Sequence, residues 1–176
     1  MTLPNLITIG RLLIVPLVVV MIGQGQWATA FLLFVAAGAS DAVDGFIARR
    51  FDMRSEFGAY IDAVADKALL VSIYVSLAVV GVLPGWLAIV IVSRDIMIIG
   101  AIIISWLMGR PVAIQPLTIS KLNTAVQIAF AAFFLFMMAF GFELGRFDLV
   151  AMWVVAALTA ASAAAYLAGW LRHMAA

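Results

Sequence analysis

Two pairs of aspartates stand within a chain of which 67% is apolar. The first pair is Asp41 with Asp44, and the second is Asp62 with Asp66. An ionised carboxylate in a membrane interior costs about 3 kcal/mol on insertion scales, so it is kept where a partner compensates its charge. The cations near these four residues are too few to compensate all of them. We therefore predict that the four carboxylates bind divalent metal.

The composition limits which metals can bind there. The chain has no cysteine and one histidine, which excludes thiolate sites and zinc sites built on several histidines. Carboxylate donors favour hard cations, namely Mg²⁺, Mn²⁺ or Ca²⁺. Four carboxylates offset about four positive charges, which suits two divalent ions. Because two-metal sites commonly hold a phosphate ester for in-line displacement, we expect phosphoryl chemistry.

The elements that carry the aspartates can bring the two pairs together. Residues three and four apart share one face of a helix, so each pair forms a stripe with small neighbouring residues. The short connection between predicted helices 27–50 and 56–80 makes them antiparallel neighbours, and the stripes can then face each other. Glycines in the stripes leave room for a ligand or for the partner backbone. The stripes consist of Asp41, Asp44, Gly45 and Ala48 in the first helix and Gly58, Asp62 and Asp66 in the second.

A purely structural interpretation of these aspartates is available. An acidic residue near a helix N-terminus often caps the helix or interacts with its dipole, and Asp62 has that position. Asp66 could pair with Lys67 or Lys121. Neither explanation accounts for the pair at the end of the preceding helix, which lies inside an apolar run.

The composition as a whole predicts a membrane protein. Only 11% of the 176 residues are charged, whereas a soluble domain carries about 25%. A helix needs about 20 apolar residues to cross the bilayer core. We therefore predict an all-α integral membrane protein with one domain, residues 1–176, and six transmembrane helices. These helices are expected at residues 6–22, 27–50, 56–80, 86–108, 119–140 and 147–172.

Basic residues gather at one end of the predicted helices, and the positive-inside rule orients the bundle from them. They are Arg49, Arg50, Arg54, Arg110, Lys121 and Arg172. Both termini and the aspartate-bearing connection are accordingly expected in the cytoplasm. The net charge of +1 argues against a nucleic-acid partner. The apolar run 12–22 imitates a secretory signal, but Pro16 in its middle favours an uncleaved first helix.

The aspartate motif resembles the signature of the CDP-alcohol phosphatidyltransferase family. It reads Asp41-x-x-Asp44-Gly45-x-x-Ala48-Arg49, then eight residues, then Gly58-x-x-x-Asp62-x-x-x-Asp66. Two further segments are similar to the CMP-forming cardiolipin synthases of this family, and they are Ser93-Arg94-Asp95 and Ile119-Ser120-Lys121-Leu122-Asn123. The phosphatidylglycerophosphate synthases of the family tend to carry other residues at Asp95, Ser120 and Asn123.

The resemblance implies transfer of a phosphatidyl group from CDP-diacylglycerol to an alcohol, with release of CMP. Phosphatidylglycerol, which would give cardiolipin, is the expected acceptor, and glycerol 3-phosphate is the alternative. The four aspartates would hold two Mg²⁺ or Mn²⁺ ions, and Asp66 would also accept the proton of the acceptor hydroxyl. The residues implied for the nucleotide site are Asp44, Gly45, Ala48, Arg49 and Gly58.

The acceptor is expected at Arg94 and Lys121, because both are cations near the cytoplasmic ends of their predicted helices. The structural alternative is an ion pair of Arg94 with Asp95 and a Lys121 that caps its helix or extends to the interface. The resemblance further implies a homodimer in a bacterial cytoplasmic membrane, with the active site facing the cytoplasm.

Three other classes of membrane protein use intramembrane carboxylates. A metal-dependent prenyltransferase would place its aspartates far apart in a longer chain, and an intramembrane aspartyl protease would need two lone aspartates. A cation transporter would hold its carboxylates near the midplane between broken helices. Release of CMP from CDP-diacylglycerol separates the transferase from all three.

Overall fold

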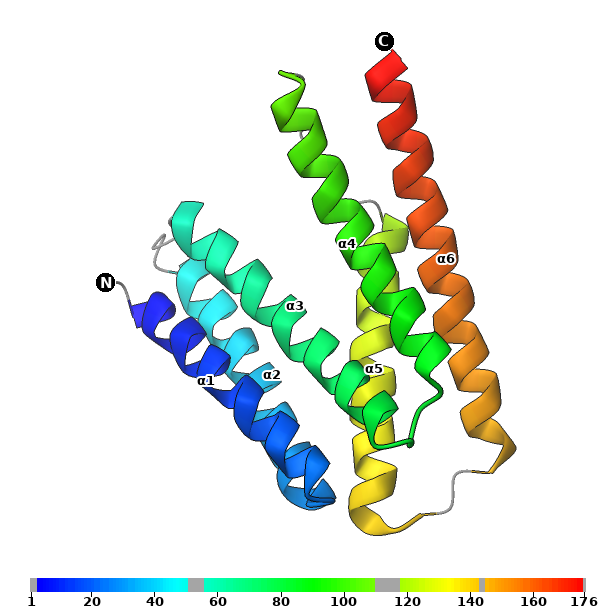
Figure 1. Cartoon of the computed structure of the whole chain (residues 1–176). Coiled ribbons are helices and arrows are strands. Elements are labelled where there is room, and N and C mark those ends of the chain that lie inside the picture. Colours follow the sequence, from blue (N-terminus) through cyan, green and yellow to red (C-terminus); the bar gives the residue numbers. More distant parts are fainter. Residues whose placement is uncertain (1–2, 51–55, 110–117, 143–144, 176) are drawn as a thin grey trace. The chain divides into compact units, whose positions relative to one another are not determined.

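The protein is described by a computed structural model that covers the backbone of residues 3–50, 56–109, 118–142 and 145–175 (Figure 1). Side chains are described for residues 10–40, 43, 65, 67–109, 118–142, 145 and 148–174. Within these ranges the regular structure is helical throughout, which confirms the predicted all-α class. The helices are α1 Leu3–Gly23, α2 Trp27–Arg50, α3 Glu56–Val79, α4 Gly85–Leu107, α5 Thr118–Phe140 and α6 Arg146–Ala175.

Glycine and proline end and begin the helices where the apolar runs break. Gly81 follows α3 with a φ of 78°, and Gly141 follows α5 with a φ of 67°. This left-handed conformation closes a helix at little cost only for glycine. Pro84, with a φ of −67°, caps α4 at its N-terminus, where a missing backbone N–H costs nothing. These residues fix the turns that separate consecutive helices.

Three helices of the described part are long and apolar enough to cross a membrane. Their spans are Gly85–Leu107, Thr118–Phe140 and Asp148–Met174. Within them, about a third or less of the most apolar stretch is buried by the protein itself. The remaining apolar side chains are exposed, as lipid-facing side chains must be. The described parts of α1, α2 and α3 contribute shorter apolar stretches, Gly10–Gly23, Trp27–Ser40 and Lys67–Val79.

The chain divides into two compact units. The first contains α1, α2 and α3 with the second half of α5. There α1 packs against both α2 and α3. Its core includes Val18, Phe34, Ile73 and Leu77.

The second unit contains α4, the first half of α5, and α6. In it α4 packs against α6. Leu87, Ile91 and Val155 form part of its apolar core. The rings of Trp86, in the first turn of α4, and Trp153, about two turns inside α6, lie 5.1 Å apart. This unit also holds a buried polar network, which is described below.

Candidate active site

The backbone places the four predicted metal ligands on two helices. Asp41 and Asp44 belong to the C-terminal part of α2, and Asp62 and Asp66 belong to the N-terminal part of α3. Each pair is three or four residues apart on a continuous helix, the spacing at which positions share one face. The predicted helical placement of the motif is therefore confirmed.

The side chains of the predicted catalytic and nucleotide sites lie outside the residues whose side chains the structure describes. The residues concerned are Asp41, Asp44, Ala48, Arg49, Asp62 and Asp66. The surroundings of Gly45 and Gly58, which have no side chain, are likewise not described. Their roles as metal ligands, base and nucleotide contacts remain predictions. Among the side chains that are described, no group of three or more His, Cys, Asp or Glu could hold a metal ion.

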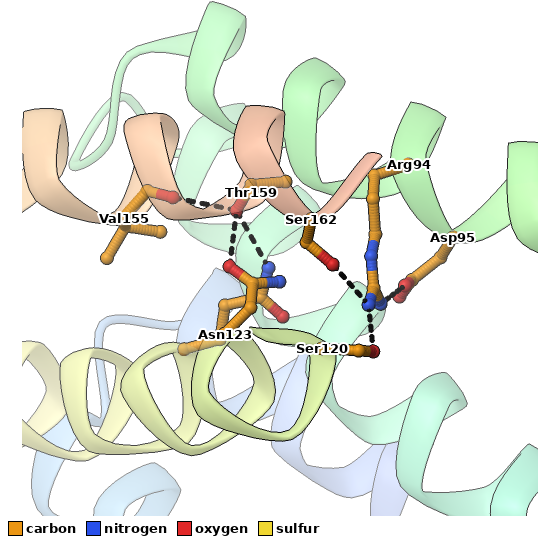
Figure 2. Close-up of polar contacts among 8 residues, drawn as sticks. Arg94, Asp95, Ser120, Asn123, Val155, Thr159 and Ser162 are labelled. Carbon is orange, nitrogen blue, oxygen red and sulfur yellow. Dashed lines mark hydrogen bonds and ion pairs between the residues drawn. The ribbon is translucent and has the colours of Figure 1, made fainter. Parts of the chain in front are cut away.

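Arg94 of α4 is buried, with 3% of the residue exposed. Its Nη1 donates to Asp95 Oδ1 at 2.6 Å. Its Nη2 donates to Ser120 Oγ of α5 and, at 2.9 Å, to Ser162 Oγ of α6 (Figure 2). The Tyr166 ring lies 5.8 Å from Arg94 Cζ, within cation–π range. A buried charge in an apolar protein is thus paired and hydrogen-bonded, as its desolvation demands.

The guanidinium in this arrangement has few donors left for a phosphate. Of its five N–H groups, the two on Nη2 serve Ser120 and Ser162, and one on Nη1 serves Asp95. Arg94 Nε is buried and has no hydrogen-bond partner among the described residues. A bidentate hydrogen bond from the guanidinium to a phosphate that used Nη2 would require Ser120 or Ser162 to move away. The Arg94–Asp95 ion pair of the structural alternative is present, while an acceptor-binding role for Arg94 remains a prediction.

A second polar cluster continues along the same helices. Thr159 of α6 lies 3.0 Å from Asn123 Oδ1 and 2.7 Å from Val155 O, and its hydroxyl can donate to either (Figure 2). Gln127 Nε2 donates to Thr159 Oγ1 at 3.1 Å. On α5, residues 120, 123 and 127 recur at helical spacing, so they form one polar stripe. This stripe joins both clusters into one network between α4, α5 and α6.

Lys121 lies outside this stripe and, unlike the neighbouring Ser120 and Asn123, it is exposed. It is one of the first residues of α5, adjacent in sequence to the buried Ser120. The structure thus places the two predicted acceptor cations in different surroundings, one inside the polar network and one at the protein surface.

Sequence reasoning noted Ser120 and Asn123 only as positions that separate branches of a family. It missed Thr159, Ser162 and Tyr166 because they lie in an alanine-rich run that reads as close helix packing. The available signal was their spacing. Residues 159, 162 and 166 are three and four apart in an apolar helix, which marks one polar face. Thr159 and Ser162 of that face are buried, and they contact Asn123 and Arg94.

The sequence matches the family model described as CDP-alcohol phosphatidyltransferase over residues 1–162. The matched segment includes the whole aspartate motif and both polar clusters up to Ser162. The chain therefore belongs to the CDP-alcohol phosphatidyltransferase family, and the resemblance seen in the motif is confirmed. With its apolar spans, it is an integral membrane protein.

Curated relatives fall in two groups by name. The chain is 35% identical to a probable cardiolipin synthase (CMP-forming) of Drosophila melanogaster over 73% of its own length and 45% of the relative. It is 32% identical to the human cardiolipin synthase (CMP-forming) over 93% of its own length and 59% of the relative. It is 30% identical to the CDP-diacylglycerol–glycerol-3-phosphate 3-phosphatidyltransferase of Bacillus subtilis, over 91% of its own length and 90% of the relative. The chain spans about half the length of the first two curated relatives that it matches, 45% and 56%.

Proposed function

We propose that this protein transfers the phosphatidyl group of CDP-diacylglycerol to an alcohol and releases CMP. The observation that carries the proposal is the family match over residues 1–162, which contains every position of the aspartate motif. The helical backbone at both aspartate pairs supports it, since the motif needs helical spacing to form two stripes.

The proposed metal site consists of Asp41, Asp44, Asp62 and Asp66. The donor set fits Mg²⁺ or Mn²⁺, because it contains hard carboxylate oxygens without sulfur or imidazole. Two bound ions would neutralise charge on the pyrophosphate of the substrate as the bond to CMP breaks. We place the cytidine diphosphate against Asp44, Gly45, Ala48, Arg49 and Gly58, where the glycines leave room and the Arg49 guanidinium can offset phosphate charge.

Asp66 is proposed as the base as well as a ligand. It would take the proton from the acceptor hydroxyl while that oxygen forms a bond to the phosphorus that carries the lipid. The bond from this phosphorus to the bridging oxygen breaks, and CMP leaves with the electron pair. A positioned base of this kind contributes about 10²–10⁴-fold to the rate.

The acceptor proposed first is phosphatidylglycerol, which would give cardiolipin. The cardiolipin synthases among the relatives and the Arg94–Asp95 pair, where the other branch tends to differ, support this choice. Glycerol 3-phosphate is the second candidate acceptor. It is favoured by the match to the Bacillus subtilis glycerol-3-phosphate 3-phosphatidyltransferase, which covers 90% of that relative's length. Arg94 and Lys121 are the proposed acceptor-binding cations, Lys121 from an exposed position where a phosphate can reach it.

The proposal extends to topology and assembly. Six transmembrane helices with both termini in the cytoplasm would put the aspartate motif at the cytoplasmic face, where CDP-diacylglycerol presents its nucleotide. The basic residues of the connections support this orientation. A homodimer in a bacterial cytoplasmic membrane is proposed from the family resemblance.

The test uses the purified full chain with CDP-diacylglycerol and phosphatidylglycerol in mixed micelles. CMP is quantified after treatment with a chelator and after addition of Mg²⁺ or Mn²⁺. We expect no CMP in chelator, recovery with either ion, and a loss of at least about 10²-fold in Asp66→Asn. Metal-independent CMP release, or an Asp66→Asn variant as active as the parent protein, would refute the proposed site.

A further inference from the structure

Asn123 of α5 carries a hydrogen-bond donor that no described residue accepts. The residue is fully buried. Its Oδ1 lies 3.0 Å from the Thr159 hydroxyl, whereas its Nδ2 has no hydrogen-bond partner among the described residues (Figure 2). A buried donor left without a partner costs about 1–3 kcal/mol. With Asn123 Oδ1 facing the Thr159 hydroxyl, the open Nδ2 indicates a partner outside the described part of the chain.

Arg94 offers a second open donor in the same network. Its Nε is buried and has no partner in the described part of the chain. Ser120, which accepts from this guanidinium, lies one helical turn before Asn123 on the same face of α5. Asn123 Nδ2 and Arg94 Nε thus belong to side chains on different helices. Hydrogen bonds to Ser120 of α5 and to Ser162 and Thr159 of α6 place both side chains in one network.

The charge of this network limits what can bind. The Arg94 charge is matched by Asp95 at 2.6 Å, and the other members are neutral amides and hydroxyls, namely Ser120, Asn123, Gln127, Thr159 and Ser162. A phosphomonoester carries a charge of about −1.5 to −2 at neutral pH, and among the described residues the buried network contains no cation besides Arg94 to match it. A lipid headgroup with hydroxyls and a singly charged phosphodiester supplies oxygen acceptors at a smaller electrostatic cost.

We propose that Asn123 is a specificity-determining residue that donates its Nδ2 hydrogen to an oxygen of the acceptor headgroup, and that Arg94 Nε donates to the same headgroup. Together the two donors select an alcohol on a phosphodiester lipid over an alcohol on a phosphomonoester. This inference rests on the proposed transferase function and deepens it by naming the residue that selects the acceptor class.

The experiment measures initial rates of CMP release from CDP-diacylglycerol with phosphatidylglycerol or glycerol 3-phosphate, each varied separately. The variants are Asn123→Ala and the isosteric Asn123→Asp, which replaces the donor by an acceptor and keeps the shape. Ser105→Ala is the matched control, because Ser105 is also fully buried and hydrogen-bonded to Trp170 in the same unit but outside the network. Thermal unfolding of each variant in detergent accompanies the kinetics.

In the parent protein, kcat/KM is expected to be higher for phosphatidylglycerol than for glycerol 3-phosphate. Both Asn123 variants should lower kcat/KM for phosphatidylglycerol about tenfold or more, the loss of one hydrogen bond to the substrate. The KM for CDP-diacylglycerol should stay unchanged, and Ser105→Ala should keep the parent kinetics.

Several results would overturn the inference. An unchanged KM and kcat for phosphatidylglycerol in Asn123→Asp would mean that Nδ2 faces only a buried water. A preference of the parent protein for glycerol 3-phosphate would refute the acceptor class while the transferase function stands. No CMP from the parent protein with either acceptor would instead refute the proposed function, and the inference with it.

Discussion

The Arg94–Asp95 pair allows a quantitative test of the buried network. Asp95→Leu removes the carboxylate at 2.6 Å and leaves the Arg94 charge, on a residue 3% exposed, without its counter-ion. Breaking a buried ion pair in this way costs about 3–5 kcal/mol of unfolding free energy. The hydroxyls of Ser120 and Ser162 still solvate the guanidinium, so we expect the lower end, about 3 kcal/mol.

Two comparisons isolate the charge from the shape. Ser162→Ala removes one interhelical hydrogen bond, and such bonds in membrane proteins average about 0.6 kcal/mol. The double variant Arg94→Met/Asp95→Leu removes both charges, and replacing a whole buried pair by apolar residues is often neutral or stabilising. It should therefore be more stable than Asp95→Leu alone. Arg172→Ala, at an exposed position, is the control and should change stability by less than about 0.5 kcal/mol.

The assay is reversible unfolding in mixed detergent micelles, followed by tryptophan fluorescence and circular dichroism. The expected order of stability loss is Asp95→Leu, then Ser162→Ala, then Arg172→Ala. The reasoning is refuted if Asp95→Leu costs no more than Ser162→Ala, or if the double variant is less stable than Asp95→Leu. Either result would mean that the guanidinium is charge-compensated or solvated by something other than Asp95.

Two further predictions concern the turns and the aromatic side chains. Gly81→Ala should cost about 1–2 kcal/mol of unfolding free energy, because the φ of 78° is unfavourable for alanine while no atom within 4 Å would meet the new methyl group. Gly100→Ala, in the middle of α4 with equally open surroundings, should instead stabilise by about 0.5–1 kcal/mol; equal effects at the two glycines in thermal unfolding would contradict this. A double-mutant cycle of Trp86→Ala and Trp153→Ala should give a coupling energy of about 0.5–1.5 kcal/mol for rings 5.1 Å apart, and additive losses would argue against the contact.

The helix bounds were predictable because glycine and proline residues mark breaks between the apolar runs. Gly81 and Pro84 end one apolar run and begin the next, and the predicted bounds agree with the structure to within three residues. The differences have physical reasons. Helix α1 begins at Leu3, before the predicted start, because Pro4 is tolerated in a first turn. Helix α6 continues to Ala175, since Arg172 and His173 suit the negative end of the helix dipole.

The buried polar network was less accessible to sequence reasoning. Adjacent residues on a helix do not normally face each other, so an Arg94–Asp95 contact is not required by their positions. It forms here together with bonds from the same guanidinium to Ser120 and Ser162, which lie 26 and 68 residues further along the chain. Contacts of that kind depend on how α4, α5 and α6 pack. The spacing of polar residues shows only that each helix has a polar face.

The aspartate motif is the opposite case. Its residue types and spacing predict a metal and phosphate site without reference to packing, and the family match supports that interpretation. What sequence spacing leaves open is the acceptor. In the proposal above, discrimination between a lipid headgroup and a small phosphorylated alcohol rests on buried donors such as Asn123 Nδ2, which become visible only when their partners across the helices are known.

The most direct test of the central claim follows the two phosphorus atoms of CDP-diacylglycerol separately. The substrate is labelled with ³²P either at the phosphorus that carries the lipid or at the one that carries cytidine, and is offered to the purified protein with Mn²⁺ and phosphatidylglycerol. The account predicts that the first label passes entirely into a new phospholipid and the second entirely into CMP, with both transfers lost in Asp66→Asn. Release of the first label as phosphatidic acid without a new phospholipid, or transfer of the second label to the acceptor, would contradict phosphatidyl transfer.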